Sequence, residues 1–176
     1  MGAAFTLFLL VTLPVFPAAQ SAGRDAPSAP RLIFTKEFPH SDPEYYRIAL
    51  GADGQAVYST APDDEAAQHF RVSPQLAQQA FDLAARLQYF RGGALETRKK
   101  VASMGKKTMV YEDGNERTQA AFNYSENPDA MALAEVFERI SNTQQHRIML
   151  ERVARYEKLG LMKQLLVLER DRKSVV

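Results

Sequence analysis

The sequence contains no cysteine. Disulfide bonds, thiolate metal sites, a cysteine nucleophile and a lipid-modified cysteine are therefore excluded for these residues. A chain without covalent cross-links must be held together by its hydrophobic core. We expect a core large enough for one domain, because about 155 residues follow the apolar N-terminal segment described below.

An excess of charge of either sign is also lacking. Lys and Arg number 22 against 21 Asp and Glu, for a formal net charge of +1. No strong overall field attracts nucleic acid or a membrane surface. We therefore expect no nucleic-acid partner.

Long apolar runs are scarce, and the main one lies at the N-terminus, from Ala3 to Phe16. As a helix it would rise about 21 Å, short of the roughly 30 Å hydrocarbon core of a bilayer. Small residues follow, and Ala19-Gln20-Ser21 suits signal peptidase; Pro17-Ala18-Ala19 is a second choice. Residues 1–21 are predicted to be a signal peptide, although no Lys or Arg precedes the run. The alternative is an apolar N-terminal helix of a cytosolic protein.

The signal peptide predicts a secreted protein, periplasmic or extracellular if the source is bacterial, with no integral membrane span after cleavage. Residues 22–30, rich in Ser, Ala and Pro, are predicted to form a flexible spacer. An α+β domain is expected over 31–142, and C-terminal helices over 143–176, packed on the domain or extending it.

The first half of the domain has the pattern of strands. The stretch 31–38, RLIFTKEF, predicts a first strand. In 45–60 apolar and polar positions alternate on both sides of Asp53-Gly54, which indicates a hairpin with a tight turn. A short apolar segment, 69–72, follows a loop.

A helix is predicted next. Ser73 suits the N-cap and Pro74 the first turn. One apolar stripe recurs at helical spacing through Leu76, Ala80, Leu83, Leu87 and Phe90, and the segment 91–93, Arg-Gly-Gly, is predicted to end the helix.

The second half repeats this order. A hairpin is predicted over 107–124 with Asp113-Gly114 at its turn; Met109 and Tyr111 face one way, and Thr108 and Val110 the other. A helix starts at Asn127-Pro128. Its expected core positions are Ala130, Leu133, Phe137 and Ile140. The two halves share little beyond Asp-Gly, so the internal similarity is weak.

From Asn142 onward the sequence is helical in pattern, with a separation predicted at Gly160. Residues 143–173 carry twice as many basic as acidic side chains. A basic amphipathic helix binds a membrane or a partner helix, or simply covers the sheet, and we favour packing on the domain with the last helix free to dimerise. Glu151 and Arg155 are expected to form a surface pair. The predicted fold class is α+β: an antiparallel sheet of two hairpins and one or two extra strands, with helices on one face and a helical C-terminal tail.

The stretch 101–108, VASMGKKT, has a superficial likeness to a phosphate-binding loop. The required spacing, Gly-x-x-x-x-Gly-Lys-Ser/Thr, fails: residue 100 is lysine, and Thr108 stands one place late. β-formers follow Gly105 where a helix is required. We therefore predict the start of a strand.

A basic cluster remains around that stretch. It comprises Arg98, Lys99, Lys100, Lys106 and Lys107. It would suit an acidic partner, a polyanionic glycan or a phosphate backbone. The interpretation we favour is a solvated loop and strand entrance whose lysines discourage edge-to-edge pairing.

Candidate catalytic and metal-binding residues are few. His40, Asp42 and Glu44 lack the glycine-bearing spacing of a calcium loop, so a turn is favoured. The segment 63–65, Asp-Asp-Glu, is interpreted as a solvated loop. His69 and His146 are isolated in the sequence, and no catalytic signature occurs. No catalytic, cofactor-binding or metal-ligating residue is assigned, and no cofactor is expected.

Four tyrosines fall on predicted strands: Tyr45, Tyr58, Tyr111 and Tyr124. On one exposed face they would form a platform for sugar or peptide. The alternative we favour is packing under the helices or along the sheet edge.

The pattern YYRIALGADGQAVY at 45–58, followed by a hairpin and helix over 107–140, resembles uncharacterised exported bacterial domains. Their elements are a Tyr-x-Ile-x-Leu strand, an Asp-Gly turn into Val-Tyr, and a second hairpin and helix. The resemblance covers about residues 31–142 and implies export and fold, without an activity or site residue.

Two functions are therefore kept. The preferred one is a non-catalytic exported module that binds protein, peptide or glycan through the sheet or the terminal helices, with another exported protein or a cell-envelope component as partner. The alternative is a hydrolase in which His69 or His146 meets an Asp or Glu in a deep pocket.

Overall fold

The computed structural model describes residues 29–92 and 94–156. The predicted signal peptide, most of the predicted spacer, and the tail with Gly160 lie outside the described residues. The last residue of the spacer is held by the sheet, because the amide of Ala52 donates a 3.0 Å hydrogen bond to the carbonyl of Pro30.

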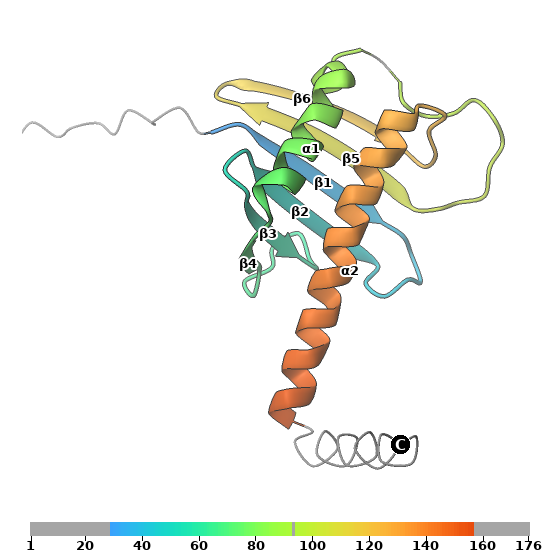
Figure 1. The fold of residues 1–176 in the computed structure, drawn as a ribbon. Coiled ribbons are helices and arrows are strands. Elements are labelled where there is room, and N and C mark those ends of the chain that lie inside the picture. The colour runs from blue at the N-terminus through green and yellow to red at the C-terminus, as the bar shows by residue number, and fades with distance from the viewer. Residues whose placement is uncertain (1–28, 93, 157–176) are drawn as a thin grey trace, which may run out of the picture.

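Six strands form one antiparallel sheet in the order β4-β3-β2-β1-β5-β6 (Figure 1). Their bounds are β1 Arg31–Glu37, β2 Tyr45–Gly51, β3 Gln55–Ser59, β4 Gln68–Arg71, β5 Lys106–Asp113 and β6 Glu116–Phe122. The first strand is central: β1 pairs with β2 on one side and with β5 on the other. Both hairpins are thereby joined to the same strand.

The predicted Asp-Gly turns are both present. Gly54, with φ +80°, connects β2 to β3, and Gly114, with φ +56°, connects β5 to β6. These left-handed angles are the reason that glycine follows aspartate at each turn.

Two helices, α1 (Pro74–Arg86) and α2 (Pro128–Tyr156), cover one face of the sheet (Figure 1). The predicted caps are confirmed. The hydroxyl of Ser73 accepts a 3.2 Å hydrogen bond from the amide of Leu76, and Asn127 Oδ1 accepts one of 2.9 Å from the amide of Asp129. The predicted α+β fold with helices on one face is likewise confirmed.

The end of α1 differs from the prediction. The apolar stripe suggested a helix reaching residue 90, but α1 ends at Arg86. Gln88, Tyr89 and Phe90 form a left-handed turn, η1, with φ of 52°, 49° and 66°. This turn still buries Phe90, so the apolar spacing marks the core correctly but not the backbone conformation.

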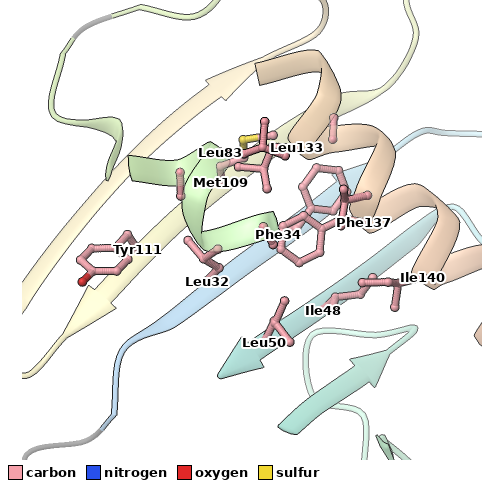
Figure 2. Packing of buried hydrophobic residues seen from close by; sticks show 14 of the residues in the cluster. Leu32, Phe34, Ile48, Leu50, Leu83, Met109, Tyr111, Leu133, Phe137 and Ile140 are labelled. Carbon is pink, nitrogen blue, oxygen red and sulfur yellow. The ribbon is translucent and has the colours of Figure 1, made fainter. Parts of the chain in front are cut away.

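The core fills the space between the helices and the sheet (Figure 2). Phe34 of β1 stacks on Phe137 of α2 with ring centroids 5.0 Å apart and an angle of 2° between the planes. Strand alternation predicts which positions face inward, and the structure agrees at Met109 and Tyr111. All four core positions predicted on α2 are buried, namely Ala130, Leu133, Phe137 and Ile140.

Helix α2 is one unbroken element of 29 residues. It crosses the expected division at residue 142, so the segments on either side of that position are a single helix. Its C-terminal end continues past the sheet (Figure 1), and there Met149 and Leu150 are 63% and 65% exposed. The predicted pair Glu151–Arg155 is replaced by Arg147–Glu151, with 3.3 Å between Nε and Oε1.

Over residues 29–92 and 94–156, none of the helices combines the length and the apolar character that crossing a bilayer would need.

Candidate ligand site beneath helix α2

The stretch that resembles a phosphate-binding loop leads into a strand, as predicted. Strand β5 begins at Lys106, directly after Gly105, whose φ is +86°. A Cβ atom on Gly105 would lie 2.8 Å from Cβ of Phe38 and 3.2 Å from Cε of Lys36. Glycine is therefore needed at position 105, because the backbone there packs closely against the end of β1.

The predicted solvated lysine cluster is divided by the strand. Lys107 is only 2% exposed, whereas Arg98, Lys99, Lys100 and Lys106 are exposed. Successive residues of a strand point to opposite faces, so Lys106 and Lys107 leave the sheet on opposite sides. The expected solvated loop and strand entrance is thus wrong for Lys107, which enters the strand but is buried.

Backbone carbonyls hold the buried ammonium group. Lys107 Nζ donates a 3.0 Å hydrogen bond to the carbonyl of Asn123 and makes a longer contact of 3.5 Å with that of Met104. It also lies 5.9 Å from the centre of the Phe122 ring. Burial lowers the pKa of Lys107, because desolvation disfavours its charged form.

A second lysine lies beside it on the central strand. Lys36 of β1 is the register partner of Lys107, and both point to the face that the helices cover. Its Nζ is 2.8 Å from Oε1 of Glu138 on α2, in a partly buried ion pair. Among the described residues, no Asp or Glu forms an ion pair with Lys107.

Two cavities meet at the Lys36–Glu138 pair. The larger one, of about 480 Å³, is lined by Lys36, Met104, Lys107, Pro128, Met131, Ala132, Ala134, Glu135 and Glu138. The smaller one, of about 170 Å³, is also lined by Lys36 and Glu138, together with residues such as Phe38, Tyr46 and Gln145. The ion pair therefore belongs to both linings.

A larger hollow of about 590 Å³ runs along α1, but it is a shallow surface between exposed polar side chains such as Gln75 and Gln79. It contains no buried charge. The cavity of about 480 Å³ combines an apolar wall with a buried cation, which is the pattern expected of a site for a small molecule.

The predicted turn around His40 is present, and the Glu44 carboxylate accepts a 2.9 Å hydrogen bond from the amide of His40. In the predicted acidic loop, Asp64 caps the backbone: its Oδ2 accepts from the amide of Thr60 at 2.8 Å, and its Oδ1 from that of Ala66 at 2.9 Å. These bonds lower the pKa of Asp64, and the bond from Thr60 has the largest effect.

The histidines of the hydrolase hypothesis lie on separate elements. His69 is exposed on β4 and His146 is exposed on α2. Neither forms an ion pair with a carboxylate in the part of the chain that the structure describes. In the same residues, no group of three or more His, Asp or Glu side chains converges as a metal site would require.

The four tyrosines do not form one platform. Tyr58 and Tyr111 are buried on the face that the helices cover, as the favoured interpretation expects. Tyr45 belongs to the opposite face of the sheet, and Tyr124 follows the end of β6.

Tyr58 belongs instead to a buried polar group. Its hydroxyl is 3.5 Å from Oγ of Ser141, which accepts a 2.8 Å hydrogen bond from Gln145. Desolvation raises the pKa of Tyr58, so this phenol stays neutral.

No protein-family model matches this chain, and no curated protein matches it.

Proposed function

We propose that this protein is a binding module and that its ligand occupies the cavity beneath α2. The observation that supports this most directly is the buried Lys107, which belongs to the lining of the cavity and has no ion-pair partner among the described residues. Burial of a lone charge is costly unless it is paired. An apolar side chain at this buried position would contribute more to stability than a lysine does. The presence of Lys107 is therefore better explained by ligand binding than by stability.

The shape of the site supports the same proposal. A cavity of about 480 Å³ lies within the usual range for small-molecule sites, and apolar side chains with a few polar groups form its lining. Export belongs to the proposal as well, on the strength of the apolar run 3–16. N-terminal sequencing of the protein from the exported fraction tests that part, with a start after residue 19 or 21 as the expected result.

Methionine NMR tests the site. Met104 and Met131 line the cavity, while Met149 is exposed on the distal part of α2 and serves as an internal control. With methyl-¹³C methionine in the protein, a mixture of small fragments of different charge is titrated in. We expect at least one fragment to shift the Met104 and Met131 signals together and to leave Met149 in place.

The opposite pattern would contradict the proposal. If fragments move only the Met149 signal, binding occurs on the projecting part of α2, which was among the surfaces expected from the sequence. If no fragment moves either cavity methionine, the cavity does not admit ligands of this size.

A further inference from the structure

We propose that the ligand of this cavity is a monoanion with an apolar body, of which a medium-chain carboxylate is the simplest example. This inference rests on the proposed function and adds the chemical class of the ligand. It is carried by the hydrogen-bonding capacity of Lys107, the apolar wall and the distribution of charge around the cavity.

The ammonium of Lys107 has one donor to spare. A lysine Nζ carries three N–H groups, and two of them are directed at the carbonyls of Asn123 and Met104. One remaining N–H suits a single anionic oxygen. A hydrogen bond between two charged groups is stronger than one between neutral groups, so an anion gains more here than a neutral ligand does.

The rest of the lining favours an apolar body. The apolar part of the lining comprises Pro128, Met131, Ala132 and Ala134 of α2 together with Met104 of the loop before β5. Methionine side chains adapt to ligands of different shape because they are unbranched and polarisable. An alkyl chain would cover the exposed side chain of Met104, which is 47% exposed.

Acidic residues limit the charge that the site can accept. Glu138 is neutralised by Lys36 at 2.8 Å, but Glu135 is exposed at the rim of the cavity and lacks an ion-pair partner among the described residues. A ligand with two negative charges would be repelled by Glu135 while gaining only one donor. A monoanion is therefore favoured over phosphate-like dianions.

Three ligands with the same chain test the inference: octanoate, octanol and octylamine. Each is titrated into the full chain, and affinity is read from the Met104 and Met131 methyl signals. We expect octanoate to bind about tenfold more tightly than octanol, as a charge-assisted hydrogen bond predicts, and octylamine to bind more weakly than either.

Two substitutions in the lining and one control outside it assign the preference to the site. In Lys107→Met the advantage of octanoate over octanol should disappear, while Lys100→Met, which changes an exposed lysine of the neighbouring loop, should preserve it. Glu135→Gln should tighten octanoate about two- to threefold and weaken octylamine, because it removes a surface charge near the ligand. The comparison of ligands on the unsubstituted protein remains decisive if Lys107→Met fails to fold.

The outcomes separate the two proposals. If the three ligands bind equally, or octylamine binds best, the cavity is a ligand site but the monoanion is wrong. If none of them moves Met104 and Met131 while mixed-charge fragments do, only this inference fails. If no compound of either set moves those signals, the proposed function fails with it.

Discussion

At the scale of single residues, Gly105 shows how a local backbone requirement positions the candidate site. Its φ is positive, and a Cβ atom added there would lie 2.8 Å from Cβ of Phe38, so there is no room for a side chain. The added Cβ would also lie 3.2 Å from Cε of Lys36, so a side chain at 105 would press on the lysine of the ion pair. The glycine that suggested a phosphate loop is thus required for packing.

Gly105→Ala should lower the free energy of unfolding by about 2–3 kcal/mol, because the new methyl group adds a steric clash to an unfavourable φ. Gly114→Ala is the matched control: φ is also positive, +56°, but nothing lies within 4 Å of the added Cβ. It should cost only about 1 kcal/mol. Urea unfolding of both variants measures the difference, and equal losses would show that contact with Phe38 is unimportant.

The left-handed turn at 88–90 allows a second comparison. Gln88 has φ +52° and an exposed side chain, so Gln88→Gly relieves strain and should leave stability within about 0.5 kcal/mol of the parent protein. Gln79→Gly, at an exposed position inside α1, should cost about 1 kcal/mol. Thermal unfolding followed by circular dichroism gives both values. A larger loss for Gln88→Gly would indicate that its side chain holds the turn.

Asp64 gives a dependence on pH. The pKa of Asp64 in the folded protein is lowered, chiefly by the hydrogen bond from the Thr60 amide. Its contribution to the free energy of unfolding is therefore complete above the unfolded pKa of about 4, and it is lost as pH falls through the lower folded pKa. Asp64→Ala should cost about 1 kcal/mol at pH 7 and progressively less in acid.

Asp64→Asn serves as its control. The amide oxygen still accepts a hydrogen bond, but the side chain does not titrate, so the slope of stability against pH below about 4 should be smaller than in the parent protein. Urea midpoints between pH 2.5 and 7 provide the measurement. An unchanged slope in both variants would show that other carboxylates determine the acid response.

Part of the candidate site was predictable from the sequence. The alternation that places Met109 and Tyr111 inward also places Lys107 inward. Lys36 lies two residues after Phe34 on β1, so it points to the same inward face as Phe34. Their meeting was not predictable, because it depends on β1 pairing with β5, a strand distant in sequence. The part played by Glu138 was not predictable either, because it depends on the packing of α2 over that pair of strands.

At the scale of elements, caps were predicted more reliably than helix ends. Ser73 and Asn127 begin their helices as expected, because cap residues act through local hydrogen bonds. The end of α1 was misplaced, since the left-handed turn at 88–90 contains no glycine to indicate it. The continuity of α2 was also missed, because the polar residues after Ile140 resemble a boundary.

The N-cap of α2 should contribute measurably to stability. Asn127→Ala removes the acceptor for the amides of Asp129 and Ala130, at 2.9 and 3.3 Å, and should cost about 1 kcal/mol. Asn142→Ala, at an exposed position within the same helix, should be neutral or slightly stabilising because alanine favours helix. Chemical denaturation compares the two, and an equal effect would mean that the cap contributes nothing.

At the scale of the whole molecule, the two similar halves of the sequence are not separate units. The hairpin β2–β3 and the hairpin β5–β6 both join β1, and their inward residues belong to one hydrophobic cluster beneath both helices. Arg86 of α1 also pairs with Asp129 of α2 at 2.9 Å, which links the helix of one half to that of the other. Each half alone would expose an edge of the sheet and an apolar face.

This arrangement predicts a single cooperative unfolding transition. The near-ultraviolet signal, which in this chain comes mainly from tyrosines such as Tyr46 and Tyr58, should change with the same midpoint as the far-ultraviolet signal of the backbone. Phe137→Ala removes a ring stacked on Phe34 and should lower the free energy of unfolding by about 3–5 kcal/mol. The midpoints of the two signals should therefore fall by the same amount. Phe137→Leu, which keeps most of the apolar volume, should shift both by less. If the two signals separate in the parent protein or in either variant, the halves unfold independently, and the central position of β1 does not couple them.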